Sequence, residues 1–408
     1  MAEEMKPLVA ISSYPPRPCG IATFVEEALE FIHRYMPDRP IHVISHTDGT
    51  GENVHPIIDP SRRDWYEPVA ELVRELDPYA VHVQHEYSLY EHVENGRGDN
   101  NEGFLQLLDL IRDYPVIVEP HTVHGRLMEH EQVFIRGLLE RATVVILKCD
   151  YQKWRLPWTF RDWDWALPHN VAVIPHGARA DRRYGDHEIN GIKDELGLGE
   201  LKGRRVAGLV GWIQSNKRWD IVLDCWEEIE RIVYGRTGEH WLLFAAGDVR
   251  DPNDQPEFDK YRAMLAELEQ KELAKFLRFS PRGDVYYQVM AICDFVILPS
   301  IDETQSGTLA RIIALNKPYV TTAPMEGLTS QTLENEGGLL FTNKRSLERK
   351  VIRLAADEGL RRELGESLKW YLENRVGWDV VVPQYLQVYE DARKAKETGV
   401  PVEYPPEF

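Results

Sequence analysis

The segment RGDVYYQVMAICDFVILPSIDETQSGTLARIIALNKPYV, residues 282–320, decides the fold class. It contains, in order, an amphipathic run (285–292), a short apolar run (295–298), a polar loop (299–307), a second amphipathic run (309–315) and a strand-like run after Lys317-Pro318. The order helix, buried strand, loop, helix and strand is the repeating unit of an α/β sheet. Because such folds bind ligands just past the carboxyl end of a parallel strand, loop 299–307 is a candidate site.

The chemistry of this loop favours an anion that carries a sugar. Ser306, Gly307 and Thr308 are predicted to open the second helix, where free N–H groups and the positive end of the helix dipole attract negative charge. Asp302 and Glu303 add carboxylates that can accept hydrogen bonds from hydroxyls or balance developing positive charge. The alternative is a purely structural turn, because Ser, Gly and Thr often cap helices.

Length, composition and charge limit the classes of function. A chain of 408 residues is natural for two domains, and 43% hydrophobic with 28% charged residues is ordinary for a globular protein. A net charge of -19 argues against a nucleic-acid partner or an anionic membrane surface. The four cysteines lack paired spacing for zinc, and no apolar stretch suits a signal peptide or membrane span. We therefore expect a cytoplasmic protein with no metal and no transmembrane segment.

The first half of the chain alternates expected strands and helices. Strands are expected at 8–12, 41–45, 80–84 and 116–118, and helices at about 21–35 and 68–76. Gly20 precedes the first helix, while His85 and Glu86 follow one strand and His121 follows the next. Histidine can bind a sugar hydroxyl or a phosphate, and two such loops after consecutive strands favour a site. A structural hydrogen-bonding role for each histidine is the alternative.

The second half begins with another predicted strand, at 205–210, after a charged and glycine-rich stretch (178–203) that we interpret as a linker. Gly211, Lys217 and Arg218 follow the strand, and a helix is expected at 219–232. Either cation could neutralise a diphosphate, although a solvated helix start would have the same sequence. Further helices are expected at about 346–374 and 380–398.

Several of these motifs resemble retaining family 4 glycosyltransferases of the GT-B fold. Glu303, the Ser306-Gly307-Thr308 turn and Asn316-Lys317-Pro318 resemble the donor-site signature of that family. Motifs of one subgroup within it are similar to the loop ending CGIATF (19–24), Gln84-His85-Glu86, His121-Thr122-Val123 and VIPHG (173–177). The resemblance therefore covers most of the chain.

The resemblance implies an α/β architecture in which two Rossmann-like domains face each other across an interdomain cleft. It places a Rossmann-like acceptor-side domain at 1–180 and a Rossmann-like nucleotide-sugar donor domain at 204–380. Residues 381–408 would form a C-terminal helix and tail that cross back to the N-terminal domain.

The resemblance also implies roles for individual residues. Glu303 would lie beside the donor sugar, and His121 is the second catalytic candidate. Lys217 matches a lysine that binds the donor phosphates, but Trp212 stands where the family has an arginine, and Arg311 stands where a second glutamate holds the ribose. The predicted donor-binding residues are Gly211, Lys217, Arg218, Arg282, Ser306, Gly307, Thr308 and Arg311. The predicted acceptor-side residues are Gly20, His85 and Glu86.

The leading hypothesis is a glycosyltransferase that moves a sugar from a nucleotide sugar to a glycan or other hydroxyl acceptor, with retention and without a separate cofactor. GDP-mannose is the donor that we consider first. The alternatives are another GT-B enzyme, such as an epimerase or phosphorylase, and a catalytically silent protein that binds sugar nucleotides or scaffolds an assembly. Four clustered tryptophans would suit either an acceptor glycan or a homo-oligomer contact: Trp154, Trp158, Trp163 and Trp165.

Overall fold

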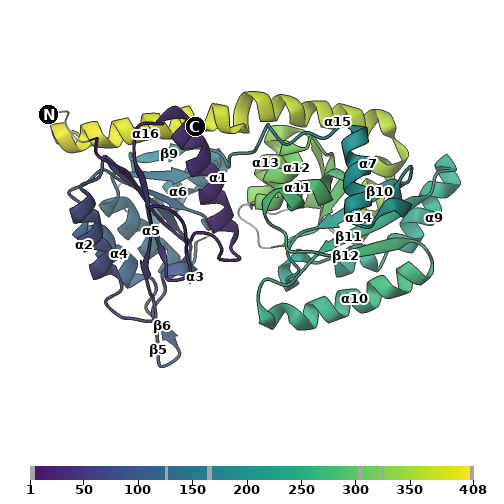
Figure 1. Cartoon of the computed structure of the whole chain (residues 1–408), viewed down its shortest axis with the longest axis horizontal. Helices are drawn as coiled ribbons and strands as arrows, with labels where there is room; N and C mark the ends of the chain where they lie inside the picture. Colours follow the sequence, from purple (N-terminus) through teal and green to yellow (C-terminus); the bar gives the residue numbers. More distant parts are fainter. Residues whose placement is uncertain (1–4, 125–126, 163–167, 302–305, 324–325, 405–408) are drawn as a thin grey trace. The chain divides into compact units, whose positions relative to one another are not determined.

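A computed structural model describes residues 5–124, 127–162, 168–301, 306–323 and 326–404. Internal contacts divide the chain into two compact units, each with its own sheet (Figure 1). Unit 1 combines the chain up to His176 with the segment from Trp378 onward, and unit 2 spans Gly177–Gly377. The helix at the end of the chain therefore belongs to the N-terminal unit.

Unit 1 is built on a seven-stranded parallel sheet of order β3-β2-β1-β4-β7-β8-β9. Its strands are β1 (Leu8–Ser12), β2 (Ile41–His46), β3 (Val54–Ile58), β4 (Ala80–His85), β7 (Val116–Pro120), β8 (Val144–Leu147) and β9 (Val171–Val173), and β5 (Val93–Glu94) pairs with β6 (Arg97–Gly98) in a separate antiparallel pair. Its helices are α1 (Gly20–Tyr35), α2 (Tyr66–Leu76), α3 (Tyr87–Tyr90), α4 (Glu102–Leu110), α5 (Glu129–Arg141), α6 (Asp150–Asp162) and α16 (Trp378–Thr398).

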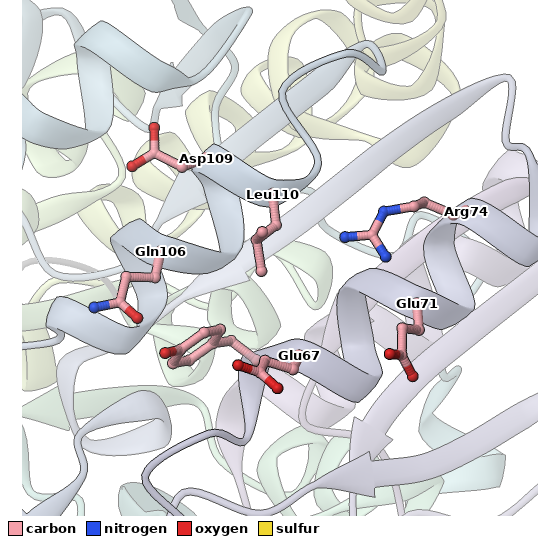
Figure 2. Close-up of a pocket in the computed structure, with 7 residues that line it drawn as sticks. Glu67, Glu71, Arg74, Gln106, Asp109 and Leu110 are labelled. Carbon is pink, nitrogen blue, oxygen red and sulfur yellow. The ribbon is translucent and has the colours of Figure 1, made fainter.

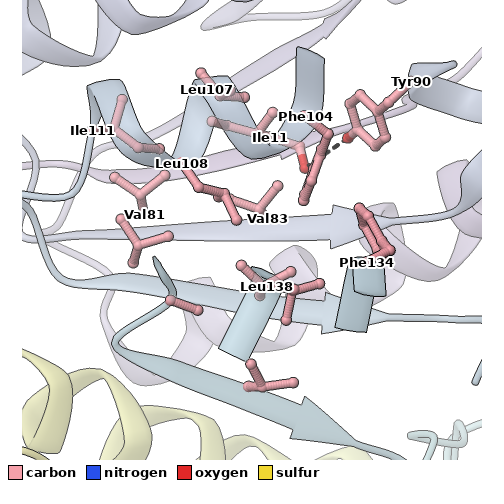
Figure 3. Close-up of a cluster of buried hydrophobic side chains, with 14 of the residues drawn as sticks. Ile11, Val81, Val83, Tyr90, Phe104, Leu107, Leu108, Ile111, Phe134 and Leu138 are labelled. Atoms are coloured by element: carbon pink, nitrogen blue, oxygen red, sulfur yellow. Dashed lines mark hydrogen bonds between the residues drawn. The ribbon is translucent and has the colours of Figure 1, made fainter. Parts of the chain in front are cut away.

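The strands of unit 1 are apolar throughout because both faces of the sheet are covered. Side chains alternate along a strand, so Val9 and Ile11 join one core while Leu8 and Ala10 join the other. The first core packs the sheet against α2, α4 and α5, and Figure 3 shows part of it. The second packs the sheet against α1 and α16. Unit 1 is therefore a three-layer α/β structure.

Unit 2 has a six-stranded parallel sheet of order β12-β11-β10-β13-β14-β15. Counted within the unit this is the Rossmann order 3-2-1-4-5-6. The strands are β10 (Arg205–Val210), β11 (Trp241–Gly247), β12 (Ala274–Arg278), β13 (Phe295–Leu298), β14 (Tyr319–Thr322) and β15 (Gly338–Phe341).

Helices also cover both faces of the second sheet, in two separate apolar clusters. The α-helices are α7 (Asp186–Glu195), α8 (Asp220–Leu223), α9 (Trp226–Thr237), α10 (Gln255–Gln270), α11 (Gly283–Ala291), α12 (Gly307–Ala314), α13 (Glu326–Asn335), α14 (Lys344–Ala356) and α15 (Glu358–Tyr371). The short 3-10 and π segments are η1 (Gly199–Leu201), η2 (Ser215–Lys217), η3 (Pro252–Asp254) and η4 (Leu372–Val376).

The deciding segment folds as its pattern predicts, into α11, β13, α12 and β14. Three other expectations are corrected. The helix expected at about 346–374 is divided into α14 and α15, because Asp357 is extended, and the π segment η4 follows α15. The stretch 178–203 is not an extended linker, because it contains α7 and packs Ile192, Leu198 and Leu201 into the core of unit 2. The helix expected at 219–232 is two helices, α8 and α9, because Cys225 leaves helical geometry, with φ -124° and ψ 0°.

Candidate functional site

The strand order places one candidate site in unit 2 at the neighbouring strands β10 and β13. From β10 the sheet continues to β11 on one side and to β13 on the other, so the order reverses here, and open α/β sheets bind ligands at such points. The loop after β10 and the loop after β13 are joined where the Ile301 amide donates to the Asn216 carbonyl at 2.8 Å. The Gly211 amide also donates to the carbonyl of Ala246, at the end of β11. The two predicted donor loops therefore meet.

Gly211 brings three elements together. Its φ of +149° lies in the region that favours glycine, and a Cβ there would stand 3.1 Å from the Tyr286 hydroxyl and 3.6 Å from Thr308 Oγ1. These two hydroxyls are themselves hydrogen-bonded at 2.8 Å. The loop after β10, helix α11 and the first turn of α12 thus converge on one point, which we call the donor corner (Gly211, Tyr286, Thr308).

Helix α12 begins at the donor corner with a formed N-cap. Ser306 is extended and buried, and its Oγ accepts from the Leu309 amide at 3.3 Å. Gly307 and Thr308 are half-buried in the first turn, where backbone N–H groups have no partner within a helix. The first turn therefore offers the local chemistry of an anion site, as the sequence predicts.

Arg311 adds a cation beside this first turn. Its Nη1 donates to the Gly307 carbonyl at 2.9 Å, and its guanidinium lies over the rings of Tyr286 and Tyr287, 4.8 and 5.2 Å from their centroids. The side chain is only 8% exposed, so its charge acts in a partly desolvated position. Positive charge is thereby placed within one helical turn of Thr308.

The remaining predicted cations differ in their surroundings. Lys217 ends η2, in the loop that is joined to Ile301, and it is half-buried. Arg218 has a left-handed φ of +49° and binds Asp220 through Nε at 3.1 Å, which raises the pKa of the guanidinium. Arg282 is exposed at the N-cap of α11, and its Nε donates to Ser280 Oγ at 2.9 Å. Arg218 is thus committed to a neighbouring carboxylate.

In unit 1, His85 and His121 have different environments. His85 is fully buried between Phe104 and Phe134, and its Nε2 pairs with Asn101 Oδ1 at 3.0 Å. This geometry supports the structural role that was left open for it. His121 is 8% exposed, and its Nε2 lies 2.6 Å from Gln84 Oε1. Burial lowers the pKa of each imidazole to about 3, so both are neutral near pH 7.

Two other predicted acceptor-side residues lie at helix starts. Glu86 caps α3 through Oε1, which accepts from the Tyr87 amide at 3.0 Å, and its Oε2 accepts from the Thr122 hydroxyl at 2.6 Å. This second bond ties the loop after β4 to the loop after β7. Gly20 opens α1, is exposed, and faces open space where a Cβ would stand.

The four clustered tryptophans and the two loop carboxylates are only partly covered by the described residues. Glu303 and Asp302 lie outside the described residues, as do Trp163 and Trp165. Trp154 and Trp158 on α6 are 40% and 45% exposed, and their rings meet edge to face at 5.8 Å. Both the glycan and the oligomer interpretations of the tryptophans therefore stay predictions.

Comparisons with known proteins agree with this geometry. Residues 195–369 match the family model described as glycosyl transferases group 1. We call these matched residues the group 1 domain. Every predicted donor-binding residue, from Gly211 to Arg311, lies within this group 1 domain, and so does Glu303.

Solved structures share the fold of the whole chain at low sequence identity. Anabaena HepE, crystallised with UDP-glucose, has a TM-score of 0.67 and 15% identity, over 94% of this chain and 99% of that one. Sucrose-phosphate synthase from Thermosynechococcus elongatus has a TM-score of 0.70 and 16% identity, over 95% of this chain and 100% of that one. WaaG, a glycosyltransferase involved in lipopolysaccharide biosynthesis, has a TM-score of 0.61 and 16% identity, over 95% of this chain and 98% of that one. The chain therefore has the GT-B architecture of two Rossmann-like domains. A comparison with curated proteins finds no match.

A surface hollow elsewhere does not compete with the group 1 domain as a phosphate site. It has a volume of about 450 Å³ and lies on α2 and α4 (Figure 2). Glu67, Glu71 and Asp109 supply carboxylates to its lining, against the one cation of Arg74. A diphosphate would be repelled there, and none of the predicted site residues lines the hollow.

Sequence reasoning missed a cluster of buried polar residues in unit 1. Glu119 and Lys148 are 0% and 2% exposed, and each ends or follows an apolar strand. A charged residue at the end of such a run was the available signal, because buried charges require partners.

Among the described residues no cluster of three or more His, Cys, Asp or Glu could hold a metal ion. No described helix is long and apolar enough to cross a membrane.

Proposed function

We propose that this chain transfers a hexosyl group from a nucleotide sugar to a hydroxyl of a glycan or other acceptor. The observation that carries the proposal is the donor corner, where Gly211, Tyr286 and Thr308 meet at the start of α12 inside the group 1 domain. Close approach of the backbone at Gly211 and the open helix start at Thr308 suit a diphosphate.

The negative charge of the leaving group would give the cations near the donor corner a role in catalysis. Departure of a nucleoside diphosphate builds negative charge, and the amides of Gly307 and Thr308 would stabilise it together with Lys217. Arg311 is the better substitute for the arginine that Trp212 replaces, because its guanidinium lies beside Gly307 while Arg218 is paired with Asp220. In this proposal amides and cations hold the diphosphate, and no separate cofactor takes part.

Two catalytic roles belong to the proposal. Glu303 would lie beside the donor sugar, where a carboxylate balances the positive charge of an oxocarbenium-like transition state. His121 is neutral and would bind a sugar hydroxyl. Gly20 and Glu86 would contribute to the acceptor side. Retention of configuration, the family 4 subtype and a cytoplasmic location are parts of the same proposal.

The donor nucleotide has two candidate bases, guanine and uracil. GDP-mannose is the donor that we considered first. The structure of Anabaena HepE with UDP-glucose makes UDP-sugars an equal candidate. Arg311 cannot hold the ribose hydroxyls as a carboxylate acceptor would, because a guanidinium only donates. The ribose contact must then come from another acceptor.

The test is a transfer assay on the purified full chain. UDP-, GDP- and ADP-sugars are first ranked by the rise in thermal midpoint that each nucleotide produces. The best donor is then incubated with a panel of hydroxyl acceptors, and nucleotide release is measured with and without acceptor. Acceptor-dependent release that falls in Glu303→Ala and Lys217→Ala, with both variants folded, supports the proposal. Full activity in both variants contradicts the assigned site.

A second candidate is a catalytically silent protein that binds nucleotide sugars. The observation that favours it is the position of Arg311, which is held within the fold by Gly307, Tyr286 and Tyr287 in place of a ribose-binding carboxylate. Binding of a nucleotide without release in the presence of any acceptor would support this candidate.

A further inference from the structure

A buried polar cluster in unit 1 connects the sheet to the C-terminal helix α16. Its centre is the Glu119 carboxyl group, which is 0% exposed. Oε1 accepts from the Tyr385 hydroxyl at 3.0 Å and pairs with the Lys148 ammonium. Oε2 accepts from Gln84 Nε2 and from His82 Nε2, each at 2.9 Å. Four donors therefore surround one carboxyl group and offset the cost of burying it.

The cluster also fixes hydrogen-bond directions. Glu119 Oε2 acts as an acceptor, so the Gln84 group that faces it must be the amide nitrogen. The Gln84 oxygen then faces His121 Nε2 at 2.6 Å, and this imidazole nitrogen must carry the proton. A proton shared between Glu119 and Lys148 would lie on the Oε1 side of the carboxyl group. Oε2 would still accept the hydrogen bond from Gln84 Nε2.

Packing holds the members of this cluster in place. Lys148 also donates to the Tyr385 hydroxyl at 3.0 Å, and its ammonium lies 4.6 Å from the centroid of the Phe24 ring. The same ring meets the His121 imidazole edge to face, with centroids 5.2 Å apart. Burial lowers the pKa of Lys148 and raises that of Tyr385, so both groups belong to the interior. The orientation of Glu119 on β7 is therefore set from three other segments: β4, the residue that follows β8, and α16.

We propose that Glu119 and Gln84 are positioning residues that hold His121 in the tautomer with its proton on Nε2. Its Nδ1 is then a hydrogen-bond acceptor, which suits a donating hydroxyl and repels the oxygen of a phosphate. In the proposed function, this tautomer would favour a hydroxyl over a phosphate oxygen at the imidazole. This inference rests on the proposed function for its substrate, while the tautomer itself depends only on the residues of unit 1.

The tautomer can be read without any substrate. The full chain is labelled with ¹⁵N-histidine, and long-range ¹H–¹⁵N correlations at pH 7 distinguish a protonated Nε2 from a protonated Nδ1. The His121 signals are assigned by their loss in His121→Asn. The inference predicts a single Nε2–H form in the wild type and a mixture of tautomers in Gln84→Met, which keeps the side-chain length but removes the directing amide.

A control variant separates this effect from a general loss of buried hydrogen bonds. Tyr389 lies one turn from Tyr385 on α16 and bonds His82 Nδ1 at 2.8 Å, but it is not hydrogen-bonded to Gln84. Tyr389→Phe removes a buried hydroxyl but leaves the Glu119–Gln84–His121 chain, so the His121 tautomer should not change. If Gln84→Met does not fold, the double variant Glu119→Gln/Lys148→Met serves instead, because an amide at 119 can present either an oxygen or a nitrogen to Gln84.

Kinetics give a second readout. Gln84→Met should lower kcat by up to about a hundredfold, since a misplaced catalytic group costs this much, with a smaller change in KM for the donor. A wild-type His121 that is protonated on Nδ1, or an unchanged tautomer in Gln84→Met, overturns the inference. If the tautomer shifts as expected but no acceptor supports transfer, the proposed function fails and the positioning role stands.

Discussion

Gly211 shows how one missing side chain sets the shape of the donor corner. Its φ is positive, and a Cβ at this position would stand close to the hydroxyls of Tyr286 and Thr308. Any Cβ would add strain and push against the Tyr286 hydroxyl, which is hydrogen-bonded to Thr308 in the first turn of α12. The residue is therefore both a backbone requirement and a part of the site surface.

Substitution of Gly211 tests this requirement. Gly211→Ala should reduce the free energy of unfolding by about 1–3 kcal/mol and weaken nucleotide binding, because the backbone conformation is strained and the corner is filled. Gly238→Ala is the matched control, since Gly238 also has a positive φ (+72°) but no atoms near its Cβ position. Chemical denaturation and calorimetric titration measure the two effects. Equal nucleotide affinity in both variants would contradict the role of Gly211.

Arg311 is expected to contribute to the diphosphate site through its charge. Arg311→Met keeps most of the packing over Tyr286 but removes the guanidinium, so we expect roughly tenfold weaker nucleotide binding, about 1.4 kcal/mol. Arg218→Met is the comparison, because Arg218 is paired with Asp220 and should matter less. Titration of both variants with UDP and GDP decides between them. A larger loss in Arg218→Met would reverse the assignment.

Buried histidines predict how stability depends on pH. Burial lowers the pKa of His82, His85 and His121 to about 3, below the value of about 6.5 in an unfolded chain. Between these values the unfolded state binds protons that the folded state does not. The free energy of unfolding should therefore fall as pH drops below about 6.5, by up to about 1.4 kcal/mol per pH unit for each histidine.

One variant isolates a single histidine of this set. His85→Phe keeps an aromatic ring between Phe104 and Phe134 but cannot titrate. Between pH 6.5 and 5, the slope of the free energy of unfolding against pH should therefore decrease by up to about 1.4 kcal/mol per pH unit, the contribution of one histidine. The variant should be less stable at pH 7, since Asn101 Oδ1 loses its hydrogen bond to His85. Urea unfolding at four pH values gives both slopes. Parallel curves for the two proteins would contradict the burial of a neutral His85.

At the scale of elements, α16 is part of the N-terminal unit although it ends the chain. Its apolar face packs on β4 and β7 with α1, and Tyr385 reaches Glu119 on β7 while Lys148 follows β8. This arrangement is a buried ion pair with hydrogen-bonded support from a distant segment. Removing one partner of such a pair leaves a charge in the interior, whereas replacing both does not.

A double-mutant cycle on this pair tests the element-level account. Glu119→Gln and Lys148→Met should each lower the free energy of unfolding by about 3–5 kcal/mol, and the double variant should lose less than the sum. Denaturant unfolding of the four proteins gives the coupling. Additive losses would show that Glu119 and Lys148 do not interact in the folded chain.

For the whole molecule, periodicity predicted the regular elements well where the pattern was strong. The strand at 295–298 is confirmed to the residue, and the helices on either side are confirmed to within two residues. The 178–203 stretch was mispredicted because its charges and glycines hide the few apolar residues that enter the core, such as Ile192. The Glu119 cluster could not be predicted, because its members come from four segments that only the tertiary fold unites.

Some features of the candidate site could likewise be predicted from the sequence, and others could not. The sequence alone indicated that Ser306, Gly307 and Thr308 open a helix past a strand, since local cap chemistry carries that information. The contact of Thr308 with Tyr286 and the stacking of Arg311 depend on packing between helices, which local patterns do not encode. The burial of His85 likewise depends on aromatic rings from α4 and α5.

The most direct test of the whole account is a crystal structure of the chain with UDP or GDP, whichever raises the thermal midpoint more. The account predicts phosphate oxygens at the amides of Gly307 and Thr308, about 3 Å away, with Gly211 in contact with the diphosphate. A nucleotide bound at another edge of unit 2, or in unit 1 alone, would contradict it.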